Sequence, residues 1–203
     1  MSEFTTTTKN VIRLNTQNTP YYLAEAINTL RGNIQLSGFK LKVIAVVSSN
    51  PSEGKSTVSL QLANSIASLK KKTLYIDCDI RNSKIKTTHK IRRKTLGLSE
   101  FLSVNATFDN ILYKVENEPY LDIIFAGAVS PNPSELFSND VFSKLLDYVR
   151  DKYDQIILDT APINSVIDGI LVTKLCDGTV LVVESGKTER SDALRAKNKL
   201  QYA

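Results

Sequence analysis

The sequence has little of the chemistry that builds disulfide scaffolds or metal clusters. Its 203 residues include two cysteines, Cys78 and Cys176, one histidine, His89, and no tryptophan. Two isolated thiols are expected to be reduced core side chains, and with a single histidine they cannot form an ordinary zinc site. The composition therefore argues against a disulfide-stabilised secreted domain and against a zinc-binding module.

Long hydrophobic runs are also missing. No apolar stretch approaches the ~20 residues of a membrane-spanning helix, and residues 1–9 lack the basic start and apolar centre of a signal peptide. Hydrophobic residues make up 42% of the chain and charged residues 23%, as in ordinary globular proteins. We therefore expect a cytoplasmic protein with one domain of ordinary size.

Acidic residues are scarce in the first half of the chain. Residues 1–100 contain 16 Lys/Arg and 6 Asp/Glu, a net charge of +10, whereas residues 101–203 contain 10 and 15, a net charge of −5. A basic half can meet nucleic acid, an anionic membrane surface or the acidic half of a second copy. It can equally be a solvated surface, so charge alone does not identify the partner.

Apolar runs alternate with helical patterns along most of the chain. Residues 1–18 are polar and without period, which predicts a flexible arm ahead of a domain at 19–203. A helix is predicted over residues 20–36, with Thr19 as its cap and Pro20 at its first position. Strands are predicted at 43–47, 73–76, 121–125, 155–158 and 179–183, and helical patterns at 58–69, 141–149 and 165–176.

This alternation is typical of an α/β protein with a parallel sheet covered by helices on both faces. Such a sheet binds ligands beyond the carboxyl ends of its strands. The basic segment 81–94 has no clear period, and we expect an exposed loop or a short helix there.

A phosphate-binding loop follows the first predicted strand. Residues 48–57 read SSNPSEGKST and end where a helical pattern begins. In a P-loop at this position, backbone N–H groups and the helix N-terminus surround phosphates, the lysine reaches the β- and γ-phosphates, and the hydroxyl ligates Mg²⁺. We therefore expect an ATP phosphate site built from Ser52, Glu53, Gly54, Lys55, Ser56 and Thr57.

Carboxylates end two further strands. Asp77 and Asp79 follow the run 73–76, and because side chains alternate along a strand both point the same way. Asp159 ends the run 155–158, as in a Walker B motif, where an acid holds Mg²⁺ directly or through water. Crowded carboxylates are expected where a divalent cation or a proton is bound, although a D-x-D pair can also be two solvated side chains in a surface loop.

Together these motifs resemble those of the bacterial tyrosine kinases. The P-loop is followed by D-x-D-x-R at 77–81 and by I-I-x-D-T-x-P at 156–162. Residues 127–136 are similar to the family segment G-x-x-P-P-N-P-x-E-L, and residues 25–34 resemble its E-x-x-R-x-x-R helix. The likeness covers roughly residues 20–200 and is to the cytoplasmic kinase subunit of capsule and exopolysaccharide synthesis in Gram-positive bacteria.

The resemblance implies a P-loop NTPase-like fold and an ATP- and Mg²⁺-dependent protein-tyrosine autokinase. Its catalytic residues would be Lys55, Asp77, Asp79 and Asp159, with Ser56, Asp79 and Asp159 at the metal. Spacing alone does not decide which aspartate accepts the tyrosine proton.

The resemblance also implies the partners. A membrane adaptor of the polysaccharide chain-length-regulator type would recruit the chain to the inner face of the cell membrane. Copies would associate into a ring through the helix that carries Glu25 and Arg31, the substrates would be protein tyrosines, and no nucleic acid would be bound.

Three positions depart from the family pattern. Asn28 stands where the helix motif has arginine, Ser52 stands where glycine is usual, and the sequence ends at residues 201–203 without the tyrosine cluster of the family. We expect Ser52 to fit with a negative φ. Two other functions stay open. One is a septum-site or partition-type ATPase; those proteins carry a second lysine at the start of the loop, where this chain has Asn50. The other is a nucleotide-binding scaffold without catalysis.

Overall fold

The computed structural model describes residues 10–15, 19–37 and 41–202. In these residues a seven-stranded sheet has the strand order β1-β4-β5-β3-β6-β2-β7, and every neighbouring pair is parallel except β4 and β5. The strands are β1 (Val11–Ile12), β2 (Val43–Ser48), β3 (Thr73–Asp77), β4 (Leu112–Val115), β5 (Leu121–Ile124), β6 (Gln155–Asp159) and β7 (Gly178–Val182).

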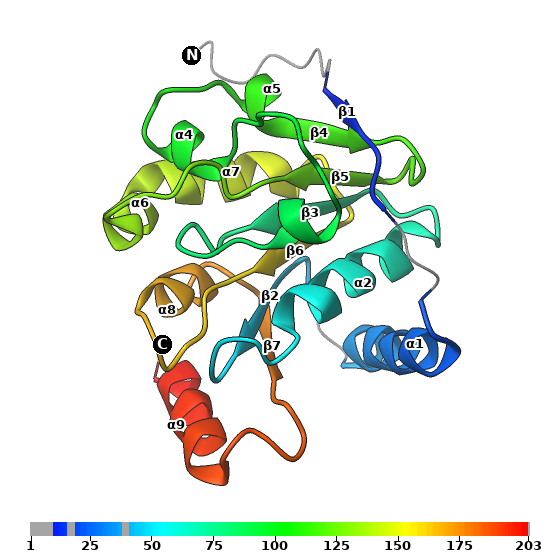
Figure 1. The fold of residues 1–203 in the computed structure, drawn as a ribbon, viewed down its shortest axis with the longest axis vertical. Helices are drawn as coiled ribbons and strands as arrows, with labels where there is room; N and C mark the ends of the chain where they lie inside the picture. Colours follow the sequence, from blue (N-terminus) through cyan, green and yellow to red (C-terminus); the bar gives the residue numbers. More distant parts are fainter. Residues whose placement is uncertain (1–9, 16–18, 38–40, 203) are drawn as a thin grey trace.

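Helices cover both faces of this sheet (Figure 1). The helices are α1 (Tyr21–Leu36), α2 (Lys55–Ala67), α3 (Ile85–Thr88), α4 (Leu98–Leu102), α5 (Phe108–Ile111), α6 (Pro133–Ser138), α7 (Asp140–Arg150), α8 (Asp168–Thr173) and α9 (Arg190–Gln201). α2 packs on the sheet and α1 packs on α2, whereas α4 to α8 bury their apolar side chains against the opposite face.

The alternation of side chains in β2 explains the two-sided core. Val43 packs with the cluster beneath α4 to α8, and Ala45 and Val47 pack near α8 and α9. Ile44 and Val46 point to the opposite face, toward α2. Because both faces are covered, all of β2 is buried, as its continuous apolar sequence predicts.

The strand order brings the three motifs to one edge of the sheet. β6 lies between β2 and β3, and Asp159 at its end is in register with Asp77 at the end of β3. β2 pairs with β6, and Lys55 after the loop that follows β2 contacts Asp159 and lies near Asp79. The P-loop and the two acidic motifs therefore meet although they are about 25 to 100 residues apart in the sequence.

Several predictions on the periphery are corrected. The predicted arm 1–18 includes β1, which pairs with β4 and buries Ile12 and Leu14; residues 1–9 and 16–18 lie outside the described residues. β4 was not predicted at all. Pro20 precedes the first residue of α1 instead of occupying it. The segment 81–94 contains the short α3, which is one of the two alternatives expected there. Among the residues that the structure describes, no helix has the length and apolarity needed to cross a membrane.

Candidate active site

The P-loop runs from the end of β2 to the first residue of α2. Gly54 caps α2 with a φ of +84°, a conformation that glycine adopts without strain. Ser52 has a φ of +64°, so the expected negative φ is wrong. A non-glycine residue is uncommon in this left-handed region and must be held there by its surroundings.

A cleft of about 390 Å³ opens over this loop. Its lining includes Ser52, Gly54, Lys55, Ser56 and Thr57 from the P-loop, Asp79, Arg81, Asn82, Lys84 and Thr88 after β3, and Ala161, Pro162, Ser165 and Val166 after β6. Five of the six residues expected to bind phosphates therefore face one cavity. The sixth, Glu53, is buried and its side chain is turned to other partners.

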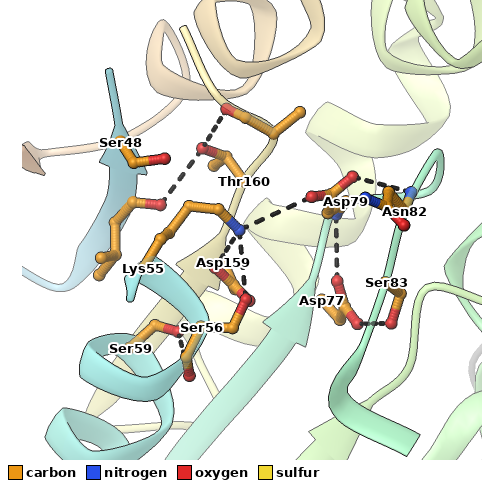
Figure 2. A network of polar contacts seen from close by, with 12 residues as sticks. Ser48, Lys55, Ser56, Ser59, Asp77, Asp79, Asn82, Ser83, Asp159 and Thr160 are labelled. Carbon is orange, nitrogen blue, oxygen red and sulfur yellow. Dashed lines mark hydrogen bonds and ion pairs between the residues drawn. The ribbon is translucent and has the colours of Figure 1, made fainter. Parts of the chain in front are cut away.

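Lys55 lies at the centre of the carboxylate motifs. Its Nζ is 2.7 Å from Asp159 Oδ1 and 3.8 Å from Asp79 Oδ2, and it donates to Ser56 Oγ at 3.4 Å. Figure 2 shows its side chain reaching from the start of α2 toward these two acids. Burial disfavours the charged ammonium, but the attraction of the surrounding carboxylates outweighs it, so the pKa of Lys55 is raised.

The two acids of the D-x-D motif differ in exposure. Asp79 lines the cleft, whereas Asp77 is 1% exposed and lies outside its lining. Desolvation, reinforced by the charge of Asp159, raises the pKa of Asp77 to about 8. Desolvation also raises the pKa of Asp79, although Lys55 opposes that shift. The two acids share a local network, since the backbone N–H of Asp79 donates to Asp77 Oδ1 at 3.1 Å.

Several supporting residues were not predicted. The hydroxyl of Tyr75 donates to Asp159 Oδ2 at 2.9 Å, and the hydroxyl of Ser83 donates to Asp77. Tyr75 is completely buried on β3, and its apolar neighbours in the sequence gave no sign of a polar partner.

Arg81 belongs to the recognised D-x-D-x-R motif, and its role becomes visible only in three dimensions. Its guanidinium binds Asp168 through two bonds, Nε to Oδ2 at 2.6 Å and Nη2 to Oδ1 at 3.2 Å. Because Asp168 is the first residue of α8, this pair ties the loop after β3 to the start of that helix.

The two predicted interface residues lie on α1, away from the cleft lining. Arg31 is half-buried and donates through Nη1 to the backbone oxygen of Ser65 at 2.7 Å and to its hydroxyl at 2.5 Å. Glu25 is exposed and accepts a 3.4 Å bond from Asn28. In the single chain, Arg31 therefore also fixes α1 on α2.

The charges of the site fit a cationic ligand. Three carboxylates, Asp77, Asp79 and Asp159, gather near one lysine, which leaves an excess of buried negative charge when they ionise. Within the described chain, no group of three or more His, Cys, Asp or Glu side chains forms a metal site by itself. Mg²⁺ characteristically takes one or two carboxylates and completes its shell with water and substrate phosphates, which suits this arrangement.

Comparisons with known proteins agree on the family. Residues 41–188 match the family model described as an AAA domain. The tyrosine-protein kinase CpsD of Streptococcus pneumoniae is 44% identical over 87% of this chain and 78% of that protein.

Solved structures match over most of the chain. The kinase domain of the Escherichia coli tyrosine kinase ETK has a TM-score of 0.85 and 28% identity, covering 98% of this chain and 78% of that one. The chimerical protein CapA2B2 has a TM-score of 0.84 and 29% identity, covering 91% and 80%. The septum site-determining protein MinD of Pyrococcus horikoshii, complexed with Mg-ADP, has a TM-score of 0.66 at 18% identity, covering 79% and 65%, and so supports the fold alone.

Proposed function

The chain belongs to the bacterial tyrosine-protein kinases of capsule synthesis, and from this premise we propose that it transfers the γ-phosphoryl group of ATP to a protein tyrosine in the cleft over Lys55. The observation that carries the proposal is the buried contact of Lys55 with Asp159 at the end of the P-loop cleft. We assign residues 19–203 to this kinase domain.

The P-loop is proposed to bind the phosphates of ATP. Backbone N–H groups at Ser52–Thr57 and the N-terminus of α2 supply partial positive charge, and Lys55 supplies a full one. Phosphoryl transfer depends mainly on alignment and charge stabilisation, and Lys55, which lies between Asp79 and Asp159 in the cleft, places its charge where the phosphates are proposed to bind.

Mg²⁺ is the cofactor that these residues suit. We assign it to the Ser56 hydroxyl, to Asp79, which lines the cleft, and to Asp159, directly or through water. When bound, the ion would neutralise charge that develops on the phosphates.

Asp77 is the residue we assign to the tyrosine proton. With a pKa of about 8, its carboxylate is a stronger base than an ordinary aspartate, whose pKa is ~3.9. Asp79 and Asp77 can be separated experimentally. Asp79→Asn should raise the Mg²⁺ concentration needed for half-maximal activity, whereas Asp77→Asn should lower kcat and leave the Mg²⁺ requirement nearly unchanged.

Partners follow from the family and from the charge distribution. A membrane adaptor of the chain-length-regulator type would recruit the chain to the inner face of the cell membrane and raise its activity. Copies would associate in a ring through Glu25 and Arg31, where the basic half of one chain meets the acidic half of the next. Such a contact should weaken with salt, because exposed charges are screened over ~8–10 Å at physiological ionic strength.

Two measurements test the activity and the assembly. Purified protein with labelled ATP and a tyrosine peptide should form phosphotyrosine; release of free phosphate without phosphotyrosine would instead identify an ATPase. Sedimentation should show an oligomer that dissociates in high salt and in Arg31→Ala. Because Arg31 also bonds to the Ser65 hydroxyl, Ser65→Ala is the matched control: it weakens the same α1–α2 contact and should leave the oligomer intact.

A further inference from the structure

The segment that follows the D-x-D motif carries an unusual density of positive charge. Between Ile80 and Ser99 the sequence contains no acidic residue. It contains seven cations, at Arg81, Lys84, Lys86, Lys90, Arg92, Arg93 and Lys94. We call residues 84–94 the basic rim.

Little of this charge is neutralised inside the chain. Among the described residues, Arg81 is the only one of the seven cations in an ion pair, with Asp168. Arg93 lies over the ring of Tyr113 at 5.1 Å from its centre, which leaves its charge in place. Lys84, Lys90 and Arg92 are exposed. The rim therefore presents a positive potential to whatever approaches it.

The basic rim forms one wall of the cleft. Lys84 and Thr88 line the cavity together with the P-loop, and Thr88 also lines a second groove formed with α1 and α2. A protein segment that brings a tyrosine to the cleft from this side must pass the rim. No large hydrophobic side chain between residues 81 and 94 is exposed, so the rim has charge but nothing to insert into lipid.

We propose that the basic rim recognises acidic residues flanking the acceptor tyrosine, so that the preferred substrate is a tyrosine in an acidic sequence. This inference rests on the proposed kinase function and adds a substrate class to it. Complementary charge raises the local concentration of an acidic segment and its rate of association at the mouth of a cleft. The effect should be lost when salt screens the surface.

Two peptides of equal length test the proposal, each with one tyrosine, flanked by glutamates in one and by glutamines in the other. At low salt we expect kcat/KM to be about tenfold higher for the glutamate peptide, with the difference shrinking at high salt. Lys90→Glu with Arg92→Glu should remove most of the preference. The matched control is Lys70→Glu with Lys71→Glu, which reverses two exposed charges in the turn before β3, at the opposite end of the sheet.

The outcomes are distinct. Equal, measurable phosphorylation of both peptides by the wild type would overturn the proposal while leaving the kinase function intact. No phosphotyrosine on either peptide would contradict the kinase function itself. Binding to phosphatidylglycerol vesicles that depends on Lys90 and Arg92, with an unchanged peptide preference, would show that the rim serves a membrane surface instead.

A second, independent observation concerns what holds the P-loop from outside. Glu53 is 6% exposed; one carboxylate oxygen accepts the Asn50 N–H at 2.9 Å and the other accepts the Thr188 hydroxyl at 2.6 Å. Asn50 Nδ2 donates to Asp192 Oδ2 at 2.8 Å. Thr188 lies in the loop between β7 and α9, Asp192 lies in the first turn of α9, and neither residue lines the cleft.

We call these bonds among Asn50, Glu53, Thr188 and Asp192 the clamp. The clamp lies next to a residue with a strained backbone. Ser52, directly before Glu53, holds the left-handed conformation that its side chain disfavours, and Lys187 Nζ lies 3.5 Å from the Ser52 carbonyl oxygen. Strained backbone persists only where the surrounding structure over-determines it. We infer that Thr188 and Asp192 are positioning residues that hold the P-loop in its nucleotide-binding shape.

Removing one bond of the clamp should weaken ATP binding. For Thr188→Val we expect about tenfold weaker binding by calorimetry, since a hydrogen bond to a charged group is lost, with kcat at saturating ATP close to wild type. Thr188→Ser keeps the hydroxyl and should bind like the wild type. The loss should be smaller in a Ser52→Gly background, because glycine adopts the left-handed conformation without help.

Circular dichroism and melting curves establish that these variants are folded. Wild-type affinity in Thr188→Val, or equal losses in Thr188→Val and Thr188→Ser, would overturn the inference. Failure of the wild type to bind ATP would instead refute the nucleotide site.

Discussion

The same three residue types, lysine, aspartate and tyrosine, meet at two opposite ends of the sheet. At the carboxyl end, Asp159 contacts Lys55 at 2.7 Å and the Tyr75 hydroxyl at 2.9 Å. At the amino end, Asp122 near the start of β5 contacts Lys114 at 2.6 Å and the Tyr153 hydroxyl at 2.7 Å. The bond distances are similar, although Lys55 and Tyr75 bind different oxygens of Asp159 whereas Lys114 and Tyr153 share Oδ2 of Asp122. The larger difference between the groups lies in what surrounds them.

The surroundings of the two groups show that the one at the carboxyl end is suited to bind a ligand and the one at the amino end is a structural contact. The Lys55 side chain is 7% exposed, and the neighbouring Asp77 and Asp79 have raised pKa values because burial and crowding disfavour their charges. The Lys114 side chain is 49% exposed and can be solvated, and its single buried acid is paired with both Lys114 and Tyr153. Excess buried charge is costly for a fold and suits a charged ligand, whereas a satisfied pair needs no ligand.

The largest expected contrast is between the two lysines. Lys55→Met should lower phosphoryl transfer by roughly 10³-fold, because one charge that stabilises the transferring group is lost. Lys114→Met should leave transfer within about twofold, since solvent screens that lysine. Initial rates with labelled ATP measure both, and circular dichroism should show an unchanged fold. Wild-type rates in Lys55→Met would contradict the assignment of the P-loop.

The crowded carboxylates at the carboxyl end of the sheet predict that the stability of the protein, in the absence of metal and nucleotide, depends on pH. Asp77 has a pKa of about 8 in the fold and ~3.9 when unfolded. Between these values the folded chain holds a proton that the unfolded chain has lost, so the free energy of unfolding falls as pH rises, by up to ~1.4 kcal/mol per pH unit. Asp77→Asn should flatten this slope while abolishing most turnover. An unchanged slope in urea titrations from pH 5 to 8 would show that Asp77 is not the cause.

The amino-end group should respond in the opposite way. Asp122→Ala removes the partner of a buried tyrosine hydroxyl, and we expect the free energy of unfolding to fall by about 2 kcal/mol with little change in kcat. The control is Asp140→Ala, which breaks an exposed pair with Lys144 on α7 and should leave the unfolding midpoint unchanged. A large loss of turnover in folded Asp122→Ala would erase the distinction between the two groups.

The smallest contrast is between the tyrosines. Tyr75→Phe and Tyr153→Phe each remove one buried hydroxyl, and each should cost about 1 kcal/mol of stability. Only Tyr75→Phe should also reduce kcat, because Asp159 would lose one of the two contacts that orient it. Equal effects of both variants on kcat would mean that the orientation of Asp159 does not matter.

The sequence alone determined the central layer and the location of the site. Buried parallel strands need apolar side chains on both faces, so β2, β3, β5 and β6 were predicted close to their observed bounds, and the apolar run of the half-buried edge strand β7 was predicted equally well. The P-loop and the acids at strand ends follow local rules of spacing. The same rules correctly predicted that Lys55, Asp79 and Asp159 lie close together, because the carboxyl ends of adjacent parallel strands share one edge of the sheet.

Only the tertiary structure decided how the site is supported. Glu53 bonds to Thr188 across 135 residues, and Ser52 has a positive φ that no local preference favours. β1 is two residues long and exists through its pairing with β4, so its own sequence carries too weak a signal. Asp77 and Asp79 have the same chemistry in the sequence, and both are buried, yet only Asp79 lines the cleft. Local pattern sets the elements, whereas burial and long-range partners depend on packing that a single sequence does not display.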